Sequence, residues 1–73
     1  MFYFSKIVGS DRILCLSPIT SRLIARSDSE LTDVSGYFLF EQTGIKEPES
    51  VRILAQVHTN EAALALKDMM GLN

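Results

Sequence analysis

The aromatic residues of this 73-residue chain all lie in two short clusters, one at residues 2–4 and one at residues 37–40. Four phenylalanines and two tyrosines form the clusters, and there is no tryptophan. Both clusters have the composition of β-strands, in which successive side chains point to opposite faces of a sheet. Each cluster therefore places bulky apolar side chains on both faces. A chain of this length has little material with which to cover two sheet faces, and this predicts association with a partner.

The length predicts a single domain, residues 1–73, near the lower end of the sizes that fold alone. Domains below roughly 70–80 residues are often stabilised by disulfides, a structural metal or a partner subunit. Cys15 is the only cysteine, so no disulfide can form within the chain. With His58 as the only histidine, a closed Cys/His zinc site cannot be built either. A partner subunit is the remaining means of stabilisation, although unaided folding at this length is also common.

The first part of the chain predicts a β-hairpin. Residues 2–8 and 12–16 are rich in apolar and β-branched residues, which is typical of strands. Gly9-Ser10-Asp11 between them has the chemistry of a turn. Two strands joined by so short a connection pair in an antiparallel hairpin.

The segment from residue 19 to residue 33 allows two interpretations. The β-branched residues Ile19, Thr20 and Ile24 favour a strand over 19–26. In that case Ser27 and Glu30, which have capping-box spacing, favour one helical turn over 28–33. The alternative is a helix that begins at Ser17-Pro18, because proline is suited to the first helical position.

The second half predicts two strands and a C-terminal helix. Residues 37–42 and 51–57 form the strands, and the helix begins after Thr59 or Asn60 and ends at Gly71. Alternation places one set of residues of the second strand on a single face, and helical spacing groups another set on the inner side of the helix. The strand set is Val51, Ile53, Ala55 and Val57, and the helix set is Ala62, Ala65, Leu66, Met69 and Met70.

These elements predict an α+β fold: a four- to five-stranded, mostly antiparallel sheet with one C-terminal α-helix packed on one face. Short connections make neighbouring strands antiparallel. A single helix covers one face only. The other face receives half of each aromatic cluster.

The net charge of −2 is distributed unevenly. Residues 1–26 have four basic residues against Asp11 and carry +3, whereas residues 27–49 have six acidic residues against Lys46 and carry −5. Opposite charges that pair across neighbouring strands explain this distribution. The alternative is a bipolar surface that orients subunits as they associate.

The sequence predicts no catalytic residues, cofactor or metal site. Cys15 lies within an apolar strand, where a thiol is buried rather than reactive. Nothing in the spacing of Cys15 and His58 indicates a nucleophile pair. The acidic residues at 28, 30 and 33 lack the spacing of a calcium loop, and their pattern indicates a solvated turn. Glu41 is the one carboxylate with apolar neighbours, at a strand end that faces solvent.

Base stacking on the aromatic clusters is disfavoured by charge. Recognition of single-stranded nucleic acid needs a basic groove, because phosphate neutralisation supplies much of the affinity. The second cluster lies in the segment that carries −5, with only Arg22 and Arg26 as candidates to lie beside it. The sequence therefore argues against nucleic acid as a partner.

We predict a homodimeric, non-enzymatic binding or regulatory module, with another protein as the alternative partner. The runner-up is a small-ligand-binding domain with a pocket between sheet and helix or at the dimer interface, for which Tyr3, Tyr37, Gln42 and Gln56 supply polar groups. The N-terminus lacks a basic leader, and no window approaches the ~18 apolar residues that cross a membrane, so the expected location is the cytoplasm. The predicted interface residues are Phe2, Phe4, Tyr37, Phe38, Leu39 and Phe40.

Overall fold

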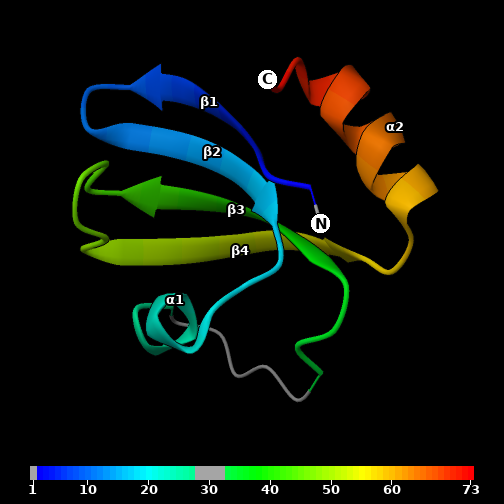
Figure 1. Cartoon of the computed structure of the whole chain (residues 1–73). Helices are drawn as coiled ribbons and strands as arrows, with labels where there is room; N and C mark the ends of the chain where they lie inside the picture. The colour runs from blue at the N-terminus through cyan, green and yellow to red at the C-terminus, as the bar shows by residue number, and fades with distance from the viewer. Residues whose placement is uncertain (1, 28–32) are drawn as a thin grey trace.

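Four antiparallel strands form a single sheet in the computed structural model of the protein, which describes residues 2–27 and 33–73 (Figure 1). The strand order is β1-β2-β3-β4, so each strand pairs with its neighbour in the chain. This confirms the predicted α+β fold with a C-terminal helix. The elements are β1 (Phe4–Gly9), β2 (Arg12–Ser17), α1 (Ser21–Ala25), β3 (Tyr37–Thr43), β4 (Ser50–Val57) and α2 (Asn60–Met70). In the described part of the chain, no helix is long and apolar enough to cross a membrane.

The predicted hairpin is confirmed, with a tighter turn than the sequence indicated. Gly9 pairs with Arg12, so only Ser10 and Asp11 connect β1 to β2. Asp11 has a φ of 59°, in the left-handed region that aspartate tolerates better than most residues. The register shifts between Ile7 and Gly9, which leaves Val8 as an extra residue in β1.

The strand predicted over residues 19–26 is wrong, because this segment contains the short helix α1. The Thr20 side chain accepts a hydrogen bond from the Leu23 amide at 3.3 Å and caps the helix. Ile19 and Leu23 then pack against the sheet, and this burial outweighs β-propensity. After α1, Ser27 makes a parallel bridge with Val51 at the outer edge of β4. The helical turn predicted over 28–33 lies, except for its last residue, outside the described residues.

The prediction that alternate residues of β4 share one face is also wrong. Phe40 pairs with Ile53 and Leu39 pairs with Ala55, so Leu54 is an extra residue in the strand. An extra residue reverses the alternation beyond it. Ile53 therefore faces the same side as Val51, whereas Ala55 faces the opposite side.

Helix α2 has the predicted ends but a different inner face. Thr59 caps its N-terminus by accepting a hydrogen bond from the Ala62 amide at 3.0 Å, and Gly71 ends it with a φ of 68°. Ala63 is fully buried and Leu66 packs beside it, whereas Met69 of the predicted stripe is 75% exposed. The chain after Gly71 returns to the sheet, where Leu72 is buried in the same apolar cluster as Ala63.

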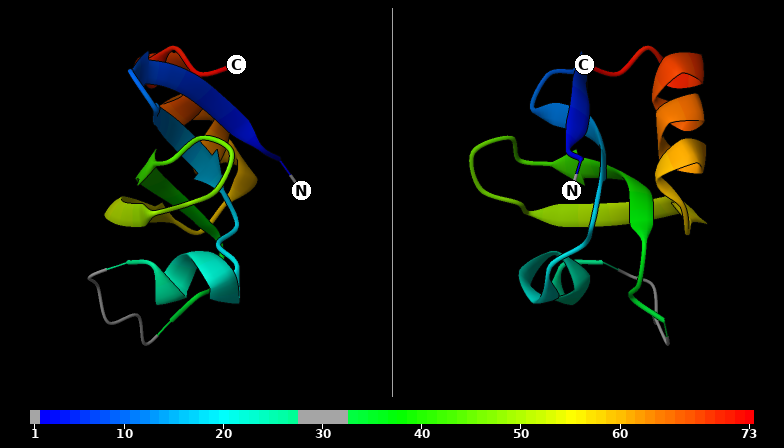
Figure 2. Two further views of the ribbon diagram at one scale, coloured as in Figure 1. Left: turned by 90° about the vertical axis from the view of Figure 1, so that its left-hand side faces the viewer. Right: turned by 45° about the vertical axis from the view of Figure 1, so that its right-hand side comes forward.

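The sheet carries a separate apolar core on each face. Figure 2 shows α2 and α1 placed at different ends of the sheet. The α2-side core consists of Leu14, Leu16, Tyr37, Leu39, Ala63 and Leu72, with Phe4, Ala55, Val57 and Leu66 packed against it. The α1-side core consists of Cys15, Phe38, Phe40 and Val51, with Ile13, Ile19, Leu23 and Ile53 packed against it.

Candidate functional site

The α1-side face of the sheet carries no charged side chain from any of the four strands. The pairing registers and the two cores show which strand residues share this face. The charged strand residues Lys6, Arg12, Glu41 and Arg52 occupy the alternate positions, on the α2 side. The α1-side set is Tyr3, Ser5, Ile7, Ile13, Cys15, Ser17, Phe38, Phe40, Gln42, Val51, Ile53 and Gln56.

Helix α1 covers only part of this uncharged face. Ile19 and Leu23 pack with the α1-side core, and α1 lies beyond β4 in Figure 1, away from β1. On the side of β1 the same face is open, and Tyr3 is 62% exposed and Ile7 66% exposed. We call this surface the open half-face and define it as Tyr3, Ser5, Ile7, Ile13 and Cys15. It is an uncharged area in which Tyr3 and Ile7 are the largely exposed side chains, whereas Cys15 is buried.

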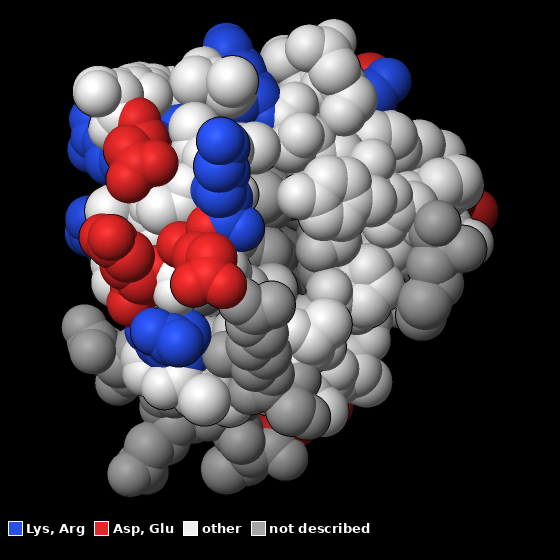
Figure 3. Space-filling model, turned by 60° about the vertical axis from the view of Figure 1, so that its left-hand side comes forward, with Lys and Arg blue, Asp and Glu red and all other residues white. Residues whose placement is uncertain are grey.

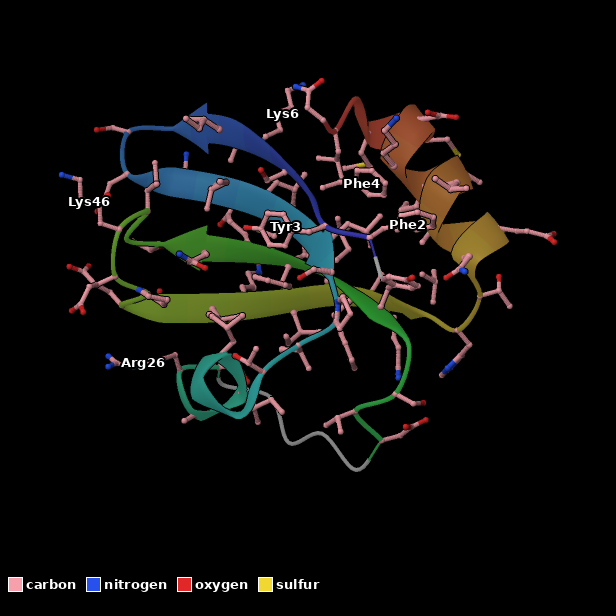
Figure 4. The ribbon with its side chains drawn as sticks, viewed as in Figure 1. Phe2, Tyr3, Phe4, Lys6, Arg26 and Lys46 are labelled. Carbon is pink, nitrogen blue, oxygen red and sulfur yellow. The ribbon has the colours of Figure 1, made fainter. Side chains whose placement is uncertain are left out.

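Tyr3 lies over the Cys15 thiol at the centre of the open half-face. The Tyr3 hydroxyl and Cys15 Sγ are 3.6 Å apart and share a hydrogen bond. This hydrogen bond and partial burial raise the pKa of Tyr3 to about 12. Burial raises the pKa of the Cys15 thiol, an effect that the Tyr3 hydrogen bond partly offsets. Figure 4 shows the Tyr3 ring on the sheet, with Phe2 and Phe4 directed toward α2.

We expect the Cys15 thiol to be unreactive in the native protein. Only 1% of the residue is exposed, and a raised pKa lowers the thiolate fraction at any given pH. Alkylation by iodoacetamide should be at least about tenfold slower than in the unfolded chain, and its rate should still be rising above pH 9.0, the ordinary pKa of the thiol. Tyr3→Ala should accelerate it, whereas Phe2→Ala on the other face should not. Equal rates in native and unfolded protein would contradict this assignment.

The structure divides the predicted interface residues between the two cores. Tyr37 and Leu39 are buried on the α2 side, and Phe38 and Phe40 are buried on the α1 side. Phe2 stacks on Phe4 and Tyr37, with ring centroids 5.6 and 6.3 Å apart. Phe2, which is 36% exposed, thus retains the most surface of the six residues that the sequence indicated.

The polar groups proposed for a ligand pocket are each engaged in a separate hydrogen bond. The Tyr37 hydroxyl donates to Asn60 Oδ1 at 2.6 Å, and the Gln42 amide donates to the Gly44 carbonyl at 2.7 Å. The Gln56 amide donates to the Ser35 carbonyl at 2.9 Å, and Tyr3 is bonded to Cys15. Three of these hydrogen bonds hold loops or the start of α2, and the Tyr3 bond lies within the first hairpin.

An open hollow of about 450 Å³ lies at the end of the sheet where the two hairpin loops meet. The Asp11 carbonyl accepts a hydrogen bond from the Gly44 amide at 2.8 Å, and its carboxylate accepts one from the Ile45 amide at 3.1 Å. Figure 3 shows acidic and basic side chains gathered at this end. The arrangement joins the two hairpins. The hollow is lined by Asp11, Gly44, Ile45, Lys46, Glu47 and Glu49.

The other acidic residues considered for catalysis or metal binding make structural contacts instead. Glu41 faces the α2 side, and its Oε2 is 4.0 Å from Arg12 Nη1 across the β2–β3 pair, as expected for opposite charges on neighbouring strands. Hydrogen bonds from the Ser35 hydroxyl and amide lower the pKa of Asp33. Within residues 2–27 and 33–73, no three His, Cys, Asp or Glu side chains are grouped to hold a metal.

Basic side chains lie at the margins of the open half-face rather than within it. Figure 4 shows Lys6 directed toward the C-terminal end of the chain, and Lys46 and Arg26 at the opposite end of the sheet. Lys67 Nζ lies 5.3 Å from the Phe4 ring centroid, on the α2 side. That the protein does not bind nucleic acid stays a prediction.

Comparison of the chain with protein-family models, with curated proteins and with solved structures found no match. The candidate site is therefore identified from its geometry alone. Sequence reasoning identified Tyr3 as part of an aromatic strand but did not single out Ile7 or Ile13. The signal that could have found them is the absence of charge at alternate positions of the first hairpin: residues 3, 5, 7, 13 and 15 are all uncharged.

Proposed function

We propose that the protein is a small, non-enzymatic binding module that acts as a homodimer. The open half-face is the observation that carries this proposal. Tyr3 and Ile7 are both more than 60% exposed, and no charged strand residue shares their face. An antiparallel sheet face that meets water normally carries polar and charged residues, and an exposed apolar patch marks an interaction surface.

Each monomer nevertheless closes both of its cores without help. Its accessible surface of 4718 Å² is close to the roughly 4,500 Å² expected for a folded monomer of 8.1 kDa. The partner subunit is therefore not needed to complete the hydrophobic cores. We expect a dimer of folded monomers, which dissociates without unfolding.

Sedimentation equilibrium tests this proposal. The predicted result is a mass that rises from 8.1 kDa toward twice that value as the concentration increases from about 10 to about 500 µM. A mass of 8.1 kDa throughout this range would overturn the homodimer and favour a different protein as the partner.

The proposal extends to the location of the protein. Its single thiol is buried and forms no disulfide, which suits a reducing compartment. We place the module in the cytoplasm, with no attachment to membranes. Fractionation of cells that express a tagged chain tests this placement, and recovery with the membranes would contradict it.

A further inference from the structure

We propose that residues 72–73 form an autoinhibitory strap, which occupies the outer edge of β1 and excludes an extended peptide from it. The surface concerned is an edge of the sheet rather than the open half-face, so the proposal does not rest on the homodimer. Three observations carry it: the backbone pairing of the strap with β1, the burial of one side chain of the strap, and the limited burial of the helix that leads to it.

The strap pairs with β1 as an added strand would. β1 lies at the edge of the four-stranded sheet, and Figure 1 shows the C-terminal end of the chain beside it. The Ser5 amide donates to the Asn73 backbone oxygen at 2.9 Å, and the Asn73 amide donates to the Ser5 carbonyl at 3.1 Å. Two residues that exchange both bonds form the hydrogen-bonded pair of an antiparallel ladder. The strap therefore has the geometry by which an extended peptide adds to a sheet.

The alternation of β1 explains why Ser5 is the residue that pairs with the strap. Opposite residues of two antiparallel strands alternate between hydrogen-bonded and non-hydrogen-bonded pairs. Because Ser5 bonds outward with both of its backbone groups, its pair with Cys15 is a non-hydrogen-bonded one, and the backbone groups of Phe4 and Lys6 face β2. Without the strap, the Ser5 amide and carbonyl would form an open edge, which is a template for another extended chain.

One side chain anchors the strap. Leu72 is 4% exposed and belongs to the α2-side core, whereas Asn73 is exposed. At the end of α2, the Leu72 amide donates to the Lys67 carbonyl at 3.0 Å, and the chain then turns back to the sheet. The chemistry of the excluded peptide follows from this contact. It is an extended segment with a leucine-sized apolar side chain at the position of Leu72, followed by a residue whose backbone is free to pair with Ser5.

The strap follows a helix that has little buried surface. In α2, all of whose residues the structure describes, only Ala63 is buried. Opening of the strap breaks two backbone hydrogen bonds and exposes Leu72, but it leaves the pairing of the four strands and the α1-side core in place. Segments with few buried groups open at a lower free energy than the whole domain. We therefore expect the strap to open while the sheet stays folded.

Amide hydrogen exchange of Asn73→Pro and its matched control Asn73→Ala measures the strap. Proline removes the amide that donates to the Ser5 carbonyl, whereas alanine keeps it. Asn73 is exposed, so both variants should fold, as far-UV circular dichroism can verify. Asn73→Pro should accelerate exchange of the Ser5 amide about fivefold, the factor that corresponds to one lost hydrogen bond. Asn73→Ala should leave it unchanged, and the Phe4 and Lys6 amides should be unchanged in both variants.

Three results of the exchange experiment would overturn the strap. One is unchanged exchange of the Ser5 amide in Asn73→Pro. Another is equal acceleration by Asn73→Ala, because the side chain rather than the backbone of Asn73 would then hold the segment. The third is equal acceleration at Phe4 and Lys6, because the sheet would then open together with the strap.

Binding of a separate peptide tests the autoinhibition. The probe is a synthetic peptide of residues 68–73, added at up to about 5 mM because the contact is small. The control peptide carries lysine in place of Leu72. The probe should shift the Ser5 amide resonance of the ¹⁵N-labelled protein, and the control peptide should not. Because an open strap raises the fraction of protein that can bind, the apparent dissociation constant should be about fivefold lower for Asn73→Pro than for the wild type.

The outcomes separate the edge, the strap and the proposed homodimer. No shift at Ser5 with about 5 mM probe, or an equal shift with the control peptide, would overturn the strand-addition site. Equal affinity of the probe for the wild type and Asn73→Pro would overturn the autoinhibition. A protein that sediments as a monomer would overturn the homodimer alone, because each monomer contains both β1 and the strap.

Discussion

Replacing Phe38 with alanine is expected to lower the free energy of unfolding by about 3–5 kcal/mol. Phe38 is fully buried in the α1-side core, between β2 and β4 and beneath α1. Loss of the ring removes its apolar burial and leaves a cavity that the surrounding strands can fill only in part. A domain of 73 residues has a total stability of roughly 4–11 kcal/mol. The substitution should therefore remove a large part of the stability of the domain.

Urea denaturation followed by far-UV circular dichroism measures this effect. The matched control is Phe2→Ala, which removes the same ring from a position that is 36% exposed at the margin of the α2-side core. The control should lose less than about 2 kcal/mol. Equal losses in the two variants would contradict the assignment of Phe38 to the centre of a core.

Replacing Gly44 with alanine should be the second most damaging change, with a loss of about 3 kcal/mol or more. Gly44 has a φ of 88°, which is unfavourable for residues with a Cβ. An added methyl group would also overlap the backbone carbonyl oxygen of Glu47. The loop that follows β3 would have to move, which would disturb the hydrogen bond from the Gly44 amide to the Asp11 carbonyl.

The control for this variant is Gly71→Ala, at the C-terminal cap of α2. Gly71 has a comparable φ of 68°, but the nearest atom to an added methyl group is Lys6 Nζ at 3.7 Å, an ordinary contact. Gly71→Ala should therefore show only the cost of the left-handed backbone, about 1–2 kcal/mol. Thermal or urea denaturation compares the two. A loss at Gly44 no larger than that at Gly71 would contradict the proposed backbone overlap.

The parts of the fold that depend on local chemistry could be predicted from the sequence. The four strands follow from runs of β-branched and aromatic residues, and short connections make them antiparallel. Thr59 and Gly71 define the ends of α2 because capping depends on a few neighbouring residues. These features need no knowledge of distant contacts.

The errors arose where tertiary contacts override local preference. Ile19, Thr20 and Ile24 favour a strand by propensity, but packing of Ile19 and Leu23 on the sheet stabilises α1 instead. The extra residue Leu54 reverses the faces of β4, and no feature of residues 51–57 signals it. Ala63 rather than Met69 of α2 meets the core, and the spacing of apolar residues within the helix does not specify this orientation.

The candidate site was only partly visible in the sequence. The aromatic clusters indicated two apolar sheet faces, and both faces exist as cores. The sequence could not show that a second helix covers the β3–β4 part of one face, because the β-branched residues between 19 and 26 favour a strand there. This cover buries Phe38 and Phe40 and leaves the open surface on the first hairpin, at Tyr3 and Ile7.

The most direct measurement is an isotope-filtered nuclear Overhauser experiment on an equimolar mixture of labelled and unlabelled chains, at a concentration where the dimer is populated. The proposed homodimer predicts intermolecular contacts that involve the exposed side chains of the open half-face, the Tyr3 ring and the Ile7 methyl groups. Intermolecular contacts confined to other surfaces, or none at up to about 500 µM protein, would contradict it.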